Sequence, residues 1–237
     1  MPDPRPKRLA VIPARGGSKR LPRKNIIPFN GKPMLAWSIE CALNSDLFDQ
    51  VHVSSEDPEI GEIARQYGAI WLQRPESLAG DRVSVAEVCL DLLEREEDAN
   101  RHYEVLVVLY AAAPLRRVSD VISVVKLVEQ EGADFAMTVT DYSHSPWEAL
   151  RVHSDGSAEL MFPDFANMKH QDRPIVKVDI GSVYAVRTSS FRQVKSFYDQ
   201  NMKVHSVPPE RGIDIDTEAD LLRVKICADI LQRGKKA

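Results

Sequence analysis

Short apolar runs alternate with amphipathic helical segments over the first 140 residues of the chain. Strand-like runs occupy residues 9–12, 50–54, 70–72, 105–110 and 135–140. Between these runs the sequence predicts helices, one opened by Pro33 and others at residues 58–68, 84–97 and 119–131. For the last of these, Ser119 is the expected N-cap and Gly132 the expected stop. This alternation predicts an α/β fold, with a mostly parallel sheet covered by helices on both faces.

The pattern breaks between residues 141 and 179. This segment contains Tyr142, Trp147, Phe162 and Phe165 together with three prolines, and it lacks clear periodicity. A stretch of this length without regular structure is uncommon inside a compact domain. It therefore predicts either a functional lid or arm, or a surface loop without a special role. A lone loop could hardly bury three large aromatic side chains, which favours a homodimer whose arms exchange contacts.

Regular structure returns after the irregular segment. Residues 181–186 are expected to form a strand, and residues 189–196 and 217–232 are expected to form helices. There is no internal repeat. The length of 237 residues suits one domain, 1–237, with 141–180 as its arm.

The loop that follows the first strand has the composition of a phosphate site. It contains Gly16 and Gly17 together with basic residues at Arg15, Lys19, Arg20, Arg23 and Lys24. Backbone N–H groups at glycine can approach an anion closely, and lysine and arginine add full charges. Neither P-loop spacing nor dinucleotide-fingerprint spacing occurs here. The loop predicts binding of a polyanion such as a triphosphate, whereas the alternative is a solvated basic loop.

Two aspartates near the C-terminus are candidate metal ligands. If residues 213–216 are extended, Asp214 and Asp216 point to one side and both isoleucines point to the other. Paired carboxylates suit Mg²⁺, which completes its coordination with phosphate oxygens and water. Alternatively, Asp216 could cap the helix that follows.

These motifs together resemble those of the sialic-acid-type cytidylyltransferases. The resemblance rests on PARGGSKRLPRKN near the N-terminus, RPESLAGD in the middle and IDIDTEADL near the C-terminus. It implies a Rossmann-like nucleotide-diphospho-sugar transferase fold, with Mg²⁺ held by Asp214 and Asp216 and with Lys24 as a third catalytic residue. It also implies nucleotide binding by Arg15, Gly16, Gly17, Ser18, Lys19, Lys24, Asn25, Arg74 and Ser84.

The sugar side departs from the common pattern of that family. Tyr110 stands where glutamine is usual, and three alanines follow it. Tyr110 with Gln171, Asp172 and Pro174 is more similar to the pseudaminic-acid enzymes, although a tyrosine at the end of a strand can also be an ordinary boundary residue. The resemblance implies sugar binding by Tyr110, Lys169, His170 and Gln171, the last three reaching a partner's sugar site from the arm.

The implied reaction is transfer of CMP from CTP to the anomeric hydroxyl of a nonulosonic acid, an acidic nine-carbon sugar of the sialic, pseudaminic or legionaminic type. Two alternatives stay open. One is a cytidylyltransferase for 3-deoxy-octulosonate, and the other is a non-catalytic nucleotide-binding module on the same fold.

Composition narrows the possible partners and the location. A formal net charge of −4 argues against a general nucleic-acid binder. The three cysteines lie far apart in predicted helices, which indicates neither a CxxC metal site nor a disulfide framework. Only a few apolar residues follow the segment 1–8 before Pro13, too few for a signal-peptide core, and no later run reaches membrane-spanning length. We therefore expect a cytoplasmic protein with no nucleic-acid or membrane partner and with reduced thiols.

Overall fold

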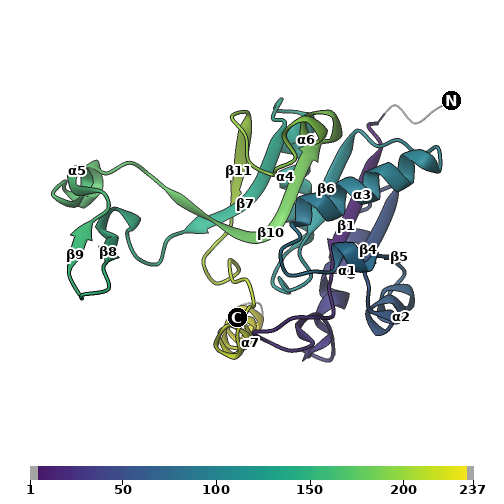
Figure 1. Ribbon diagram of the computed structural model, residues 1–237, viewed down its shortest axis with the longest axis horizontal. Helices are drawn as coiled ribbons and strands as arrows, with labels where there is room; N and C mark the ends of the chain where they lie inside the picture. The colour runs from purple at the N-terminus through teal and green to yellow at the C-terminus, as the bar shows by residue number, and fades with distance from the viewer. Residues whose placement is uncertain (1–4, 234–237) are drawn as a thin grey trace.

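The structure is a computed structural model that describes residues 5–233. The start of the segment considered above as a targeting signal, and the last four residues of the predicted 1–237 domain, lie outside the described residues. A seven-stranded sheet forms the centre, in the order β11-β7-β10-β6-β1-β4-β5 (Figure 1). Its strands are β1 (Arg8–Pro13), β4 (Gln50–Ser55), β5 (Ile70–Gln73), β6 (Val105–Leu109), β7 (Phe135–Asp141), β10 (Lys177–Arg187) and β11 (Met202–Ser206). Only β10 within this sheet pairs antiparallel, so the mostly parallel prediction is confirmed.

Helices cover both faces of the sheet because side chains along each strand alternate between them. Leu9 and Val11 of β1 pack into the core formed with α3 (Val85–Asp98) and α6 (Thr188–Val194). Ala10 and Ile12 pack into the opposite core, formed with α1 (Met34–Leu43), α2 (Pro58–Gln66) and α4 (Val118–Glu129). The two cores confirm the predicted α/β layering.

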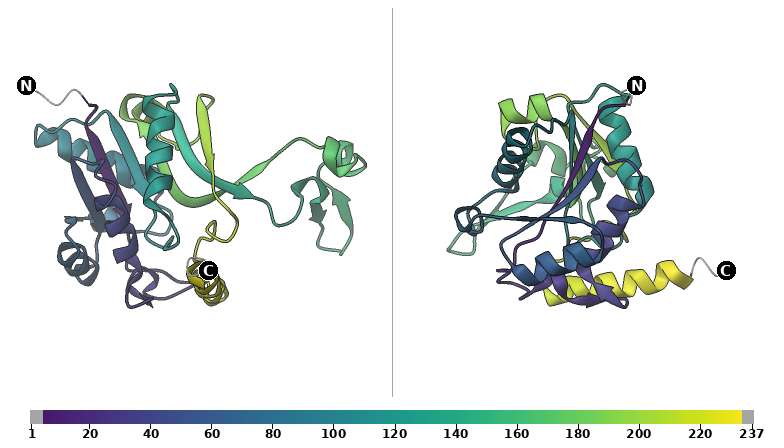
Figure 2. Two further views of the ribbon diagram at one scale, coloured as in Figure 1. Left: turned by 180° about the vertical axis from the view of Figure 1, so that it is seen from behind. Right: turned by 90° about the vertical axis from the view of Figure 1, so that its right-hand side faces the viewer.

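A third apolar cluster fixes the last helix. Val224 and Ala228 of α7 (Glu218–Arg233) pack with Leu21 and Phe29 from the segment after β1. In both Figure 1 and Figure 2, α7 therefore lies beside that N-terminal segment, which includes the short strands β2 (Pro28–Phe29) and β3 (Lys32–Pro33). The two ends of the chain that carry the predicted motifs are thus brought together.

Several predicted boundaries were wrong in detail. Arg117, not Ser119, precedes the first turn of α4, and its backbone N–H donates to the Asp120 carboxylate at 2.9 Å. Pro33 lies just before α1, which begins at Met34. β10 begins four residues before the predicted strand, because Lys177 pairs with Asp141 of β7. Strand β11 was not predicted at all.

The irregular segment forms an arm that projects from the main body (Figures 1 and 2). Its stems belong to β7 and β10, so the arm proper comprises residues 142–176 rather than 141–180. The arm has regular structure of its own: the hairpin β8 (Leu150–Val152) and β9 (Ala158–Leu160), the helix α5 (Pro163–Ala166) and the 3₁₀ turns η3 (Pro146–Glu148) and η4 (His170–Asp172).

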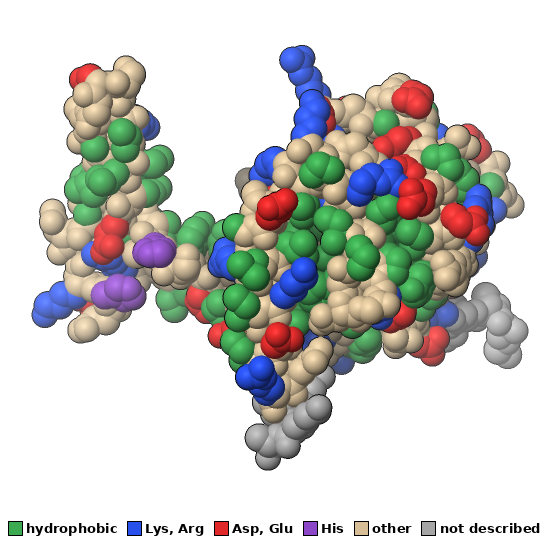
Figure 3. Space-filling view, turned by 90° about the horizontal axis from the view of Figure 1, so that it is seen from below, with side chains coloured by type: hydrophobic (Ala, Val, Ile, Leu, Met, Phe, Trp, Pro, Cys, Tyr) green, Lys and Arg blue, Asp and Glu red, His purple; other side chains and the backbone are tan. Residues whose placement is uncertain are grey.

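Three aromatic side chains of the arm pack on one another and are half-buried within the single chain. Trp147 packs on Phe165 and Phe162, with ring centroids 4.4 and 5.4 Å away, so these three rings cover one another. Other apolar side chains stay exposed, and Ile175 is 90% exposed. Figure 3 shows hydrophobic side chains on the arm and on the main body. The exposed ones on the arm include Leu150, Val152, Leu160, Met161, Met168 and Ile175.

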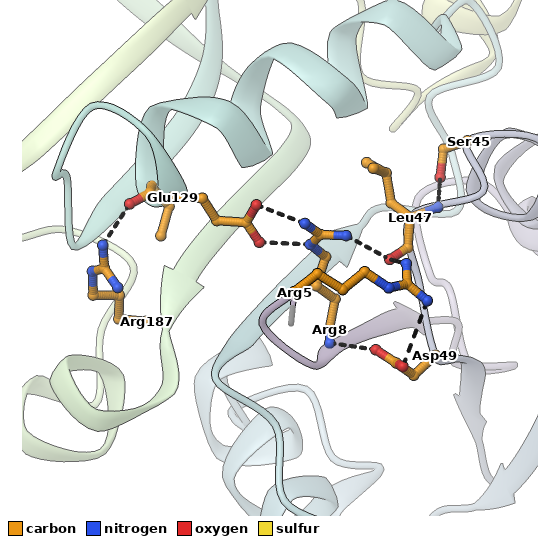
Figure 4. Close-up of polar contacts among 8 residues, drawn as sticks. Arg5, Arg8, Ser45, Leu47, Asp49, Glu129 and Arg187 are labelled. Atoms are coloured by element: carbon orange, nitrogen blue, oxygen red, sulfur yellow. Dashed lines mark hydrogen bonds and ion pairs between the residues drawn. The ribbon is translucent and has the colours of Figure 1, made fainter. Parts of the chain in front are cut away.

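A buried ion pair lies at the amino end of β1 (Figure 4). The Arg8 guanidinium donates to both carboxylate oxygens of Glu129, at 2.5 and 2.7 Å, and hydrogen bonding to Glu129 raises the pKa of Arg8. The backbone N–H of Arg8 donates to Asp49 at 2.7 Å. This cluster fastens α4 to the start of the central strand.

Replacing Glu129 by alanine is expected to lower the free energy of unfolding by about 3 kcal/mol, because the partly buried Arg8 charge loses its partner. Glu131→Ala is the matched control, since its ion pair with Lys203 is about half exposed and should contribute less than about 1 kcal/mol. Urea denaturation measures both effects. Equal losses in the two variants would contradict the structural role of the Arg8 pair.

The remaining structural expectations concern cysteines and membranes. Cys41, Cys89 and Cys227 are free thiols in α1, α3 and α7; the first two are buried, but Cys227 is only half-buried. Over residues 5–233, no helix combines the length and the apolar character needed to cross a membrane.

Candidate active site

A pocket of about 310 Å³ opens at the carboxyl ends of the strands. Pro13 ends β1, Arg74 follows β5 and Tyr110 follows β6, and all three residues line the pocket. Ligands of open α/β sheets bind at this edge. The position of the pocket therefore follows from the topology.

The pocket unites predicted residues from four separate stretches of sequence. Its lining includes Arg15, Lys24, Asn25, Arg74, Tyr110, Asp214 and Asp216. An adjoining pocket of about 280 Å³ adds Ser18 and Lys19 and shares Arg15, Lys24, Asn25 and Asp216. The predicted phosphate loop and the predicted metal ligands thus face the same space.

The basic side chains of the loop form ion pairs with carboxylates from outside the loop. Lys24 and Arg20 form ion pairs with Asp216 at 2.9 and 2.6 Å. Arg15 pairs with Asp81 at 2.7 Å, and Lys19 pairs with the same carboxylate. These ion pairs place four positive charges around the two pockets. A bound triphosphate would compete with the two aspartates for them.

The two glycines of the loop have different surroundings. The N–H of Gly16 donates to Oε1 of Glu56 at 2.7 Å, so this donor is already used within the protein. A Cβ at Gly16 would lie 2.4 Å from Asp57, whereas one at Gly17 would meet nothing within 4 Å. Gly16 is therefore needed for close approach to the turn after β4.

Asp214 and Asp216 lie in an extended segment outside the sheet. Ile213 and Ile215 turn into the cluster around α7, while both aspartates line the pocket, as the predicted alternation requires. Burial raises the pKa of Asp214 to about 6, and the neighbouring carboxylates add to the effect. For Asp216, burial acts in the same direction, but Lys24 and Arg20 outweigh it and lower the pKa.

Arg74 and Ser84 have different surroundings. Arg74 is buried, and its guanidinium donates to the carbonyl oxygen of Ser54 at 2.8 Å while it lines the pocket. Ser84 is not among the lining residues. Its hydroxyl instead accepts from the N–H of Glu87 at 3.2 Å and caps α3. Val83, Val85 and Val88 form the apolar wall beside it.

A half-buried arginine supports the Tyr110 wall. Arg116 donates to the carbonyl oxygen of Tyr110 at 2.6 Å and to that of Ser182 at 2.8 Å. Burial lowers the pKa of Arg116 to about 10. Sequence reasoning did not single out this supporting role, because Ser182 is 66 residues away. Asp81 was also missed, although it ends the RPESLAGD motif.

The predicted sugar-binding residues of the arm do not reach this pocket. Lys169, His170 and Gln171 are exposed on the arm, which projects away from the main body (Figure 1). His170 and Gln171 instead line a pocket at the arm, together with Trp147 and Arg173. Within one chain, the arm and the main pocket are separate.

The donor set of the main pocket fits Mg²⁺. Asp214 and Asp216 offer carboxylate oxygens, and no group of three or more metal-binding side chains occurs among residues 5–233. Mg²⁺ needs only one or two carboxylates when phosphate oxygens and water complete its shell. The positive charge would also offset the unfavourable burial of the Asp214 carboxylate.

Comparisons with known proteins agree with the geometry. The family model described as "Cytidylyltransferase" matches residues 9–157. The pseudaminic acid cytidylyltransferase of Campylobacter jejuni subsp. jejuni serotype O:2 is 34% identical, over 93% of this chain and 95% of that protein. The N-acylneuraminate cytidylyltransferase of Escherichia coli O18:K1:H7 is also 34% identical, over 91% of this chain and 51% of its own length.

The fold has a solved counterpart. The structure of CMP:2-keto-3-deoxy-manno-octonic acid synthetase complexed with CTP matches with a TM-score of 0.70 and 20% identity, covering 96% of this chain and 99% of that one. At this identity the likeness shows the fold alone, which is the predicted nucleotide-diphospho-sugar transferase fold.

Proposed function

Because this chain belongs to the cytidylyltransferase family, we propose that it transfers CMP from CTP to the anomeric hydroxyl of a nonulosonic acid. This proposal rests on one observation: residues of the cationic loop line the same pocket as Asp214 and Asp216. The two 34% identical relatives are named for a pseudaminic and an N-acylneuraminate substrate, which supports an acidic nine-carbon sugar as acceptor.

The reaction is a displacement at the α-phosphorus of CTP. The anomeric hydroxyl oxygen forms a bond to that phosphorus as its proton passes to solvent. The bond from the α-phosphorus to the bridging oxygen breaks, and the β- and γ-phosphates leave as pyrophosphate. Such transfers depend chiefly on positioning and on neutralising phosphate charge.

The lining residues divide these tasks. Lys24 and Arg15, with Ser18, Lys19 and Asn25 beside them, would bind the triphosphate. Arg74 lines the same pocket and would meet the cytosine, and Tyr110 would face the sugar. Asp214 and Asp216 would hold Mg²⁺, which neutralises phosphate charge and orients the phosphoryl group.

A substrate panel tests the proposal. Pyrophosphate release is measured with CTP, UTP, ATP or GTP, each paired with N-acetylneuraminate, pseudaminate, legionaminate or 3-deoxy-octulosonate. Release with CTP and a nonulosonic acid is the expected result. Turnover confined to 3-deoxy-octulosonate would assign the protein to the cytidylyltransferases that act on that sugar. Failure with every pair, despite CTP binding, would favour a non-catalytic nucleotide-binding module.

We also propose that two copies form a homodimer through the arm. The exposed apolar side chains of the arm, led by Ile175, suit burial against a second copy. Lys169, His170 and Gln171 would then lie near the sugar pocket of the partner. The separation of the arm from the pocket of its own chain supports this arrangement.

Mixing two inactive variants is expected to restore activity if the site is shared in this way. One variant carries Lys169→Ala and His170→Ala in the arm, and the other carries Asp214→Asn in the pocket. Subunit exchange would yield one intact site in each mixed dimer. Sedimentation of a fully active monomer at micromolar concentration would refute the dimer, and a dimer without complementation would refute the shared site alone.

A further inference from the structure

The phosphate loop rests on the acidic turn that follows β4. Ala14 donates its backbone N–H to the carbonyl oxygen of Ser54 at 3.0 Å, at the start of the loop. At the other end, Arg23 forms ion pairs with Asp57 and Glu59. Arg23 has a φ of 59°, which side chains seldom adopt without support. The end of β4 thus holds the start of the loop, and Asp57 and Glu59 at the start of α2 hold its other end.

Glu56 supplies the contact between these ends. Its Oε1 accepts the N–H of Gly16 at 2.7 Å, and Gly16 packs so closely on Asp57 that no Cβ would fit. The orientation of the Gly16 peptide is therefore set by Glu56. That peptide connects directly to Arg15, whose guanidinium lines the pocket.

Glu56 has one favourable charged neighbour and one unfavourable feature. Its carboxylate attracts the buried Arg74 guanidinium and so raises the pKa of Arg74, against the larger lowering by burial. The Oε2 of Glu56 is buried without a hydrogen-bond partner among the described residues, which costs free energy. A carboxylate beside a triphosphate site also repels the ligand. The contact that links Glu56 to the phosphate loop is the hydrogen bond that Oε1 accepts from the N–H of Gly16.

We propose that Glu56 is a positioning residue that fixes the Gly16 peptide, and through it the cationic loop, in the conformation that binds the triphosphate of CTP. This inference rests on the proposed function. Glu56 does not line the pocket, so it acts through the loop rather than on the nucleotide.

Three substitutions at Glu56 separate the hydrogen bond from charge and packing. Glutamine keeps a carbonyl acceptor but removes the charge. Methionine keeps the length of the side chain but offers no oxygen acceptor, and alanine removes both. Glu62→Ala is the matched control, because Glu62 is an exposed carboxylate on α2 that pairs with Arg65. Calorimetry measures CTP binding, steady-state kinetics measures both KM values and kcat, and thermal unfolding measures stability.

The acceptor-free variants, methionine and alanine, are expected to weaken CTP binding about tenfold, as loss of a hydrogen bond to a charged group would do. KM for CTP should rise with it, while KM for the sugar and the melting temperature stay close to their original values. Glutamine should retain CTP affinity within about threefold, and Glu62→Ala should change neither quantity. If the alanine variant fails to fold, the comparison of methionine with glutamine still decides.

Several results would overturn the proposal. Tighter CTP binding in all three Glu56 variants would mean that charge repulsion dominates. Equal weakening by glutamine and methionine would remove the hydrogen bond as the cause, and melting temperatures that fall in step with affinity would indicate a merely structural role. If the unmodified protein did not bind CTP, both this inference and the proposed function would be wrong. Normal CTP binding in the methionine variant would contradict this inference alone.

Discussion

Replacing Asp214 or Asp216 by asparagine is expected to lower kcat at least about a hundredfold, because a metal held by these carboxylates would supply several kcal/mol of charge stabilisation to the phosphates. Both side chains line the pocket, and their isoleucine neighbours keep the backbone anchored in the core. Pyrophosphate release at saturating CTP and Mg²⁺ measures the effect.

Stability should respond to Asp214→Asn in the opposite direction from activity. Burial raises the pKa of Asp214 from 3.8 to about 6, so the folded protein binds this proton more tightly than the unfolded chain does. The stability contributed by the protonated group is complete below about pH 4 and is lost as the pH rises through 6. At pH 7 the neutral asparagine variant should therefore melt no lower than the original protein.

Asp220→Asn is the control for the aspartate variants. Asp220 accepts from the N–H and the hydroxyl of Thr217, at 3.0 and 2.8 Å, at the start of α7. Its replacement should cost about 1 kcal/mol of stability and leave turnover intact. Near-normal rates in both the Asp214 and Asp216 variants at saturating Mg²⁺ would make the metal assignment wrong.

Lys24→Ala is expected to weaken CTP binding roughly 10- to 100-fold, since a charge-assisted contact to phosphate contributes about 1.5–3 kcal/mol. Lys19→Ala should have a smaller effect. The Lys24 side chain is 19% exposed and held by Asp216, whereas the Lys19 side chain is 79% exposed. Calorimetry with CTP gives both affinities, and melting temperatures should change little.

Lys225→Ala is the control for the lysine variants, because Lys225 is exposed on α7 and lines neither of the two pockets. Its CTP affinity should equal that of the original protein. Unchanged affinity in both the Lys19 and Lys24 variants would rule out the phosphate-loop assignment.

The pattern of apolar residues along the sequence predicted the helices and strands whose formation depends on neighbouring residues in the chain. The nearly continuous apolar run at residues 105–110 fits a strand covered on both faces, and β6 is buried throughout. Strand β11 was missed because its sequence, MKVHS, is mostly exposed and is ordered by parallel pairing with β7, some 67 residues earlier. The misplaced N-cap of α4 arose because serine has the stronger preference, while Asp120 decides the actual start.

A residue of the pocket could be predicted where one short motif contains both that residue and the neighbours that indicate its role. Lys24 belongs to the cationic loop, and Asp214 and Asp216 share the alternation of one extended segment. Glu56 and Asp81 could not be assigned, because they contact loop residues 40 and 66 positions away. Ser84 was predicted to bind the nucleotide, but the structure places it at the N-terminus of α3, where it caps the helix together with Glu87.

The arm and the pocket share one strand. From its arm end at Lys177, β10 runs between β6 and β7, and its register shifts between Asp179 and Tyr184. Gly181 lies within this shift with a φ of 56°, and a Cβ there would be 3.5 Å from Asp214. A displacement of the arm would therefore be transmitted along the continuous backbone of β10 to Gly181, which packs beside the Asp214 carboxylate of the main pocket.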